Sequence, residues 1–188
     1  MASSRRALLI LDMISEFQFV DWKPVLAAAR RVAPRIARLR ARANSSGIPV
    51  IYVNDTRDAW ESDQTRFMKR CLAPGARGQD VAQQLAPAGR DWFMFKPRHS
   101  AFYATPLGEI LDQLQVRELI LTGLTSHQCV LFTAMDAYVR NFTVAAPRDC
   151  IGAPTSAQTR HALFLLEEAL QARTAASTNL RLRQHTSR

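Results

Sequence analysis

The chain has 188 residues, of which 47% are hydrophobic and 22% charged, and its formal net charge is +9. This length and composition fit one globular domain, residues 1–188, with a sizeable core. No apolar run reaches the ~18 residues of a membrane span and the start lacks a secretory-signal pattern, so we expect a cytoplasmic protein that does not enter membranes.

The positive charge comes almost entirely from arginines spread along the chain. Many lie in one predicted helix or near the two ends, and residues 173–188 are expected to form a partly flexible basic tail. A solvated helix face explains this distribution, so no nucleic-acid partner is expected. A basic nucleic-acid-binding module stays open as an alternative function.

Strand and helix patterns alternate along the chain. Apolar runs predict strands at 7–11, 49–53, 91–95, 118–122 and 141–146, and a short last strand near 175–180. Helical spacing predicts helices at 24–46, 105–115 and 158–173, and another from residue 125 onward. Pro34 should kink or divide the first of these. The alternation predicts an α/β fold, with a parallel sheet between helical layers.

The segment from Asn54 to Arg90 is the least patterned part of the chain. Proline and glycine punctuate it, and it predicts short helices near 60–71 and 79–86. A connection of this length is expected to cover a site as a lid. Arg66 or Arg70 could clamp a substrate carboxylate, although a surface role is the favoured interpretation for each.

Three predicted strands lead into reactive side chains. Asp12 follows the first strand, Lys96 follows the third, and Cys129 comes in the first helical turn after the fourth. Open α/β sheets place their chemistry at the carboxyl ends of the strands. The start of a helix stabilises an anion such as a thiolate. Read alone, Cys129 could also be a small packed hydrophobe, or the thiol of a redox sensor.

These three groups together permit acyl transfer. The Lys96 ammonium favours the thiolate, and the Asp12 carboxylate can take the thiol proton. Cys129 would then form a thioester with loss of ammonia or an amine, and water activated by Asp12 would release the acid. Backbone N–H groups of Thr125 and Cys129 are the candidates for an oxyanion hole. Cys71 and Cys150 are expected to be unreactive.

Three motifs resemble those of the isochorismatase-like cysteine hydrolases, the superfamily of nicotinamidase and N-carbamoylsarcosine amidohydrolase. The first runs from Leu9 to Met13, with Phe17 after it. The second is Lys96 followed by Ser100-Ala101-Phe102, and the third runs from Thr122 to Val130. The resemblance implies a three-layer αβα sandwich with a six-stranded, mostly parallel sheet, and the catalytic triad Asp12, Lys96 and Cys129. It also implies a cis peptide bond between Leu124 and Thr125.

The same resemblance guides the functional prediction. We expect a cofactor-free hydrolase of a small-molecule amide, carbamoyl or related C–N substrate, assembled as a homodimer or homotetramer. Nicotinamidases carry a metal site of Asp and several His after the second strand, but residues 54–90 hold no His, so no metal is expected. An isochorismatase-type vinyl-ether hydrolase, which would need Asp12 but not the thiol, is the alternative.

The residues around these motifs carry weaker predictions. Phe17, Trp60 and Phe102 could wall the substrate pocket, although simple core packing is the more frequent fate of such aromatic side chains. His99 and His127 neighbour the motifs without metal-ligand spacing, so both are interpreted as turn residues.

Overall fold

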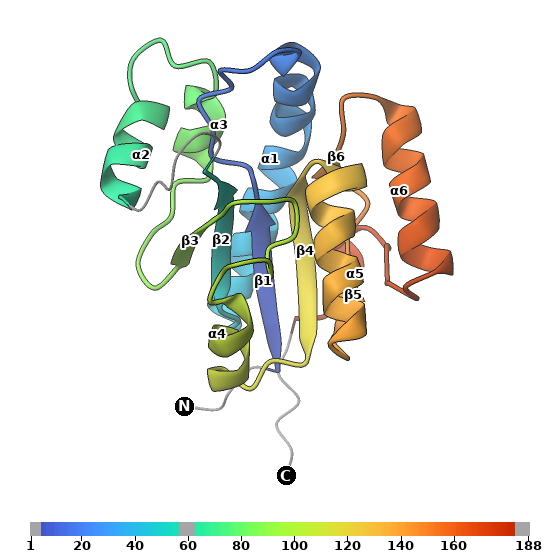
Figure 1. Cartoon of the computed structure of the whole chain (residues 1–188). Helices are drawn as coiled ribbons and strands as arrows, with labels where there is room; N and C mark the ends of the chain where they lie inside the picture. Colours follow the sequence, from blue (N-terminus) through green and yellow to red (C-terminus); the bar gives the residue numbers. More distant parts are fainter. Residues whose placement is uncertain (1–4, 57–62, 183–188) are drawn as a thin grey trace.

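The computed structural model describes residues 5–56 and 63–182, and it is built around a parallel sheet (Figure 1). Five strands lie side by side in the order β3-β2-β1-β4-β5. Their bounds are β1 (Arg6–Leu11), β2 (Val50–Asp55), β3 (Trp92–Lys96), β4 (Glu118–Leu124) and β5 (Thr143–Ala145). A short sixth strand, β6 (Ile151–Gly152), pairs in parallel with the end of β4. The predicted six-stranded parallel sheet is therefore confirmed.

The sixth strand was predicted at the wrong place. Residues near 175–180 do not form a strand but contain a short 3₁₀ helix, η2 (Ser177–Asn179). Pairing with β5 is reduced to one bridge between Arg173 and Ala145. The reason is local, because the Asp149 carboxylate accepts hydrogen bonds from both the N–H and the hydroxyl of Ser177, at 2.7 and 2.8 Å. These bonds turn the backbone away from the sheet.

Helices cover both faces of the sheet and complete the three layers (Figure 1). One hydrophobic cluster joins the sheet to α1 (Trp22–Ser45), α2 (Gln64–Cys71) and α3 (Gln79–Gln84). The other joins it to α4 (Leu107–Gln113), α5 (Leu131–Val139) and α6 (Ser156–Glu168). Side chains of β1 alternate between the two clusters, with Leu8 and Ile10 in the first and Leu9 and Leu11 in the second. This is why the strand reads as one continuous apolar run.

Pro34 does not divide the first helix, which runs unbroken from Trp22 to Ser45. Proline removes one backbone hydrogen bond from the helix interior. Eight residues of α1 are nevertheless buried on both sides of Pro34, from Leu26 to Ala43. Packing on the sheet therefore holds the two halves of the pattern in one helix.

The predicted short helices of the 54–90 segment are present as α2 and α3. Asp63 begins α2, and its side chain accepts a hydrogen bond from the N–H of Arg66. Phe67 and Cys71 of α2 and Val81 of α3 are buried in the cluster that contains α1. The segment from residue 63 onward is thus part of the packed body, and its role as a lid stays a prediction.

The chain after α6 also packs more closely than expected. Thr174, Ser177 and Leu182 are buried, and Arg42 of α1 donates a hydrogen bond to the carbonyl oxygen of Ser177 at 2.8 Å. Residues 173–182 therefore pack against the body of the domain, residues 183–188 lie outside the described part of the chain, and the partly flexible tail stays a prediction. Across the described ranges, no helix combines the length and the apolarity that a membrane crossing requires.

Candidate active site

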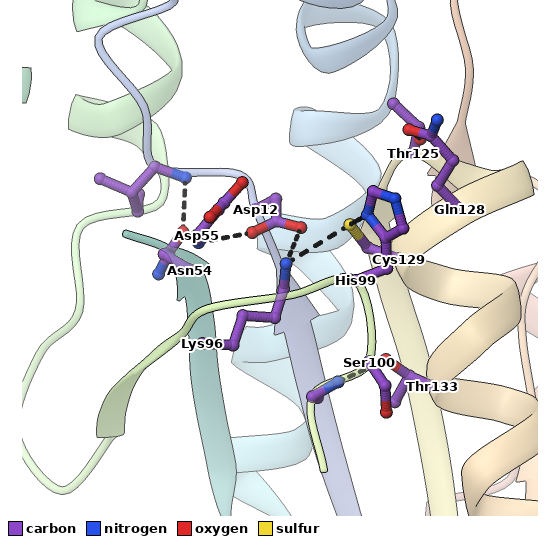
Figure 2. Close-up of polar contacts among 12 residues, drawn as sticks. Asp12, Asn54, Asp55, Lys96, His99, Ser100, Thr125, Gln128, Cys129 and Thr133 are labelled. Atoms are coloured by element: carbon purple, nitrogen blue, oxygen red, sulfur yellow. Dashed lines mark hydrogen bonds and ion pairs between the residues drawn. The ribbon is translucent and has the colours of Figure 1, made fainter. Parts of the chain in front are cut away.

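The three predicted catalytic side chains meet at the carboxyl edge of the sheet (Figure 2). Asp12 directly follows β1, Lys96 is the last residue of β3, and Cys129 lies in η1 (Ser126–Val130), a single π-helical turn between β4 and α5. In the sheet, β2 lies between β3 and β1, and β4 lies on the other side of β1. Parallel strands end at the same edge, so residues more than a hundred positions apart become neighbours.

Lys96 contacts both of the other groups. Its Nζ lies 2.9 Å from Oδ2 of Asp12 and 3.4 Å from Sγ of Cys129. The other carboxylate oxygen of Asp12, Oδ1, accepts a hydrogen bond from the N–H of Asp55 at 2.7 Å. The Lys96 side chain is fully buried, that of Asp12 is 15% exposed, and Cys129 is 8% exposed. The three groups therefore share one enclosed site with limited access to water.

Burial controls the charge state of this site. It raises the pKa of the Asp12 carboxyl, and the Lys96 ammonium and a hydrogen bond with Cys129 only partly oppose that rise. Burial acts against the ammonium of Lys96, but its interactions with Asp12, and to a lesser degree with Cys129, outweigh burial and raise the lysine pKa. Lys96 is thus charged at neutral pH, and Asp12 is a stronger base than an exposed carboxylate.

The resting thiol differs from the prediction. The helix start and Lys96 were expected to favour the thiolate, but burial and the neighbouring Asp12 carboxylate raise the pKa of Cys129, and Lys96 does not compensate. The thiol accordingly holds its proton at neutral pH. A base is needed to remove that proton during reaction, and Asp12 lies in position to do so.

The turn that carries Cys129 is built on a glycine. Gly123, near the end of β4, has φ +108°, and a Cβ there would lie 2.0 Å from the carbonyl oxygen of Leu11. The close approach of β4 to β1 thus requires glycine at this position. The peptide bond between Leu124 and Thr125 is cis, as the family resemblance implied, and Thr125 directly precedes η1.

Sequence reasoning missed His99. Its Nδ1 lies 3.8 Å from Sγ of Cys129, and its ring packs against Phe132 with 5.4 Å between the ring centroids. His127 was interpreted correctly as a residue of the turn, and burial, with the nearby His99, lowers its pKa. The sequence signal for His99 was its place three residues after Lys96, inside the second motif.

Asn54 and Asp55 also belong to the site, although the sequence placed both at the start of the lid. Asn54 is completely buried, and its side-chain oxygen accepts a hydrogen bond from the N–H of Ile14 at 3.1 Å. Together with the bond from Asp55 to Asp12, this contact fastens the chain that follows β1 to the end of β2 (Figure 2). The signal was a polar pair directly after an aliphatic strand.

The two described aromatic candidates lie in the two hydrophobic clusters. Phe17 is buried beside Phe19 on the α1 side of the sheet, and Phe102 is buried on the opposite side beside Phe142. Their place in a substrate pocket stays a prediction, and Trp60 lies outside the described residues. Arg70 pairs with Glu16 at 3.1 Å.

The two other cysteines are buried away from solvent. Cys71 and Cys150 are fully buried, and burial raises the pKa of each thiol to about 12. Within residues 5–56 and 63–182, no group of three or more His, Cys, Asp or Glu side chains is arranged to hold a metal ion.

Comparison with known proteins agrees with this architecture. The protein-family model of the isochorismatase domain matches residues 6–178 of this chain. The uncharacterized isochorismatase family protein YaaI of Bacillus subtilis is 37% identical over 170 residues, covering 90% of this chain and 93% of YaaI. The N-carbamoylsarcosine amidase of Thermoplasma acidophilum superposes with a TM-score of 0.74 at 25% identity, covering 95% of this chain and 99% of the amidase.

A second solved structure is also similar. The nicotinamidase/pyrazinamidase PncA of Bacillus subtilis has a TM-score of 0.72 at 26% identity, covering 92% of this chain and all of that protein. The family match spans nearly the whole chain and includes Asp12, Lys96 and Cys129. The chain therefore belongs to the isochorismatase family and is a hydrolase of that family.

Proposed function

We propose that this protein hydrolyses the C–N bond of a small amide or carbamoyl compound through a thioester on Cys129. The observation that carries the proposal is the contact of one buried lysine with both a carboxylate and a thiol, at 2.9 and 3.4 Å. The likeness to an amidase and a nicotinamidase at 25% identity or more supports the same reaction class.

The geometry supports a definite path for the protons. Asp12 takes the thiol proton while Sγ bonds to the substrate carbonyl carbon, and Lys96 stabilises the negative charge that passes through the sulfur. Asp12 then gives this proton to the nitrogen as the C–N bond breaks, which leaves the thioester. Water next loses a proton to Asp12 and attacks the thioester carbon. The C–S bond breaks, the acid leaves, and the proton returns to the sulfur.

The oxyanion in both tetrahedral intermediates needs hydrogen-bond donors. The backbone N–H groups of Thr125 and Cys129 are our candidates, since Thr125 directly precedes the turn η1 and Cys129 lies in it. Phe17 and Phe102 are proposed as parts of the substrate-binding region, which the small molecule would enter from the carboxyl edge of the sheet.

Trapping the intermediate tests the proposal. The protein is mixed with a panel of small amides and carbamoyl compounds, ammonia release is measured, and quenched samples are examined by peptide mass spectrometry. We expect an acyl adduct on the Cys129 peptide and loss of ammonia release in Cys129→Ala. Cys150→Ala is the matched control, because it removes another buried thiol, one on which Asp149 and Ser177 act in place of Asp12 and Lys96. An adduct on another residue, or activity that survives in Cys129→Ala, contradicts the mechanism.

A vinyl-ether hydrolase is the second candidate, and the raised pKa of Asp12 favours it. A carboxyl that keeps its proton to a higher pH can protonate an enol ether carbon directly. Such an activity would persist in Cys129→Ala and disappear in Asp12→Asn, whereas the thioester mechanism needs both residues.

A further inference from the structure

The sulfur of Cys129 has a second nitrogen neighbour that the Asp12, Lys96 and Cys129 triad does not include. Lys96 Nζ lies 3.4 Å from Sγ, and His99 Nδ1 lies 3.8 Å from the same atom. In Figure 2 the sulfur lies between the lysine amine and the histidine ring. Both distances fit hydrogen bonds to sulfur, which is larger than oxygen.

The loop that carries His99 is fastened on both sides of the ring. On one side, Lys96 ends β3 in the buried ion pair with Asp12. On the other side, the hydroxyl of Ser100 bonds to the carboxylate of Asp136, and the N–H of Ala101 donates to Oγ1 of Thr133 at 3.0 Å. Asp136 and Thr133 both belong to α5, which follows the turn of Cys129. The loop is therefore attached to the same helix that extends from the nucleophile.

The imidazole itself is braced as well. Its ring lies against Phe132, the second residue of α5, at 5.4 Å between centroids and an interplanar angle of 58°. His99 is exposed, whereas Lys96 is fully buried and Cys129 is 8% exposed. The sulfur thus meets Lys96 on its buried side and His99 on the side that faces the solvent.

Hydrogen-bond donors beside the sulfur would stabilise it when the thiol loses its proton. The thiol donates its proton toward Asp12, so the sulfur lone pairs are free to accept hydrogen bonds from N–H groups. When the proton moves to Asp12, the sulfur becomes an anion in a buried site, where charge is costly unless donors surround it. A second donor would lower that cost each time the thiolate forms.

We propose that His99 is a further catalytic residue, whose Nδ1–H donates to the Cys129 sulfur and stabilises the thiolate together with Lys96. With its proton on Nδ1, the ring donates without changing its own charge, and Asp12 remains the group that accepts and returns protons. The same donor acts again when the thioester breaks and the thiolate leaves. This role rests on the proposed thioester mechanism, but its effect on the thiol is measurable without any substrate.

The experiment compares His99→Leu, which removes the donor, with His99→Asn, whose side-chain N–H₂ can take the place of Nδ1–H. The rate of Cys129 alkylation by iodoacetamide is measured between pH 6 and 10 on the full chain, and the labelled peptide is confirmed by mass spectrometry. Among the described residues, Asp12 after β1 and Lys96 on β3 act on the thiol, His99 contacts the sulfur, and His127 lies two residues before Cys129 and interacts with His99. His161→Leu on α6 is the matched control.

We expect His99→Leu to alkylate about tenfold more slowly near pH 7.5, equivalent to a rise of about one unit in the thiol pKa. The alkylation rates of His99→Asn and His161→Leu are expected to stay within about threefold of the rate of the parent protein. His99→Asn keeps a neutral hydrogen-bond donor beside the sulfur, and His161→Leu leaves the site unchanged. Equal rates in His99→Leu and the parent overturn the proposal. Equal slowing in His99→Leu and His99→Asn also overturns it, because the effect would then follow the ring and not the donor.

Turnover supplies an independent readout once a substrate is found. His99→Leu is expected to lower kcat with little change in KM, because the donor acts on the sulfur and not on the bound substrate. A rise in KM with unchanged alkylation would assign His99 to substrate binding and overturn the role proposed here. If no amide is cleaved but the alkylation result holds, the donor role stands and only the proposed function fails.

Discussion

Lys96 and Asp12 form an ion pair of 2.9 Å in which the lysine side chain is completely buried. Such a pair is costly to desolvate, and removing one partner leaves the other charge uncompensated. The pair therefore serves the site more than the stability of the fold, and its two halves depend on each other.

Lys96→Met tests this dependence. The Asp12 pKa is expected to rise further, because the ammonium that lowers it is gone. The free energy of unfolding at pH 7 should fall by about 3 kcal/mol, measured by urea denaturation, and hydrolysis should be lost. The double variant Asp12→Asn with Lys96→Met should recover much of that stability, since no unpaired charge remains. Strictly additive losses in the double variant would show that the two side chains are not coupled.

Asp55→Asn is expected to move the pH profile. The negative charge of Asp55 raises the pKa of Asp12, so its removal lowers that pKa and leaves the bond from the Asp55 N–H in place. Activity that needs ionised Asp12 should then extend to lower pH, with the acid limb of kcat/KM shifted by less than about one unit. Asp80→Asn removes the same charge from α3, far from the sulfur, and is expected to leave the limb unchanged. A shift to higher pH, or equal shifts in both variants, contradicts the assignment of the limb to Asp12.

The buried thiols predict a loss of stability at alkaline pH. Burial raises the pKa of Cys71 and Cys150 from 9.0 to about 12. Above pH 9 the unfolded chain releases thiol protons that the folded chain retains, so the unfolded state binds fewer protons and the free energy of unfolding falls as pH rises. Each thiol contributes a slope of about 1.4 kcal/mol per pH unit in this window. Urea denaturation between pH 8 and 11 measures it.

Cys150→Ala provides the control for that slope. A cavity lowers stability at every pH, whereas loss of the thiol makes the alkaline slope shallower by the contribution of one group. Parallel curves for Cys150→Ala and the parent protein would refute the titration of Cys150 as a cause.

Gly123→Ala should damage the fold and the site together. The new Cβ would meet the Leu11 carbonyl at 2.0 Å, and the φ of +108° is strained for any residue with a side chain. We expect a loss of about 3 kcal/mol in the free energy of unfolding, with activity reduced because Leu11 precedes Asp12. Gly108→Ala on α4 is the matched control, because its Cβ would contact nothing within 4 Å. It should be neutral or stabilise by up to about 1 kcal/mol.

The sequence predicted those parts of the fold that depend on long apolar patterns. The runs that became β1, β2 and β4 are almost wholly buried, so the apolar pattern alone located them. β3 is an edge strand with Trp92 exposed, and its run of aromatic residues located it. β6 has only two residues, Ile151 and Gly152, and no periodicity can be read from so short a segment. Residues 175–180 looked extended, but the hydrogen bonds of Asp149 to Ser177 decide their shape, and that contact joins positions 28 apart.

The sequence also predicted only some features of the candidate site. Asp12, Lys96 and Cys129 could be located because each one ends a strand pattern or begins a helix. The raised pKa of Cys129 could not, because it depends on how completely the fold excludes water and on which charge lies nearer. His99 was missed for the same reason, since its approach to the sulfur depends on how a loop is fastened to α5 through Ser100 and Ala101.

The order of strands in the sheet also limits when catalytic competence can arise as the chain folds. The Cys129 thiol lies in the turn after β4, and the Lys96 amine is on the last residue of β3. In the sheet, β1 and β2 lie between these two strands. No fragment that lacks either inner strand can bring these two groups into contact. Under the proposed mechanism, enzymatic turnover is consequently an assay for assembly of β3, β2, β1 and β4, and during refolding it should return only after spectroscopic signals of helix content have recovered.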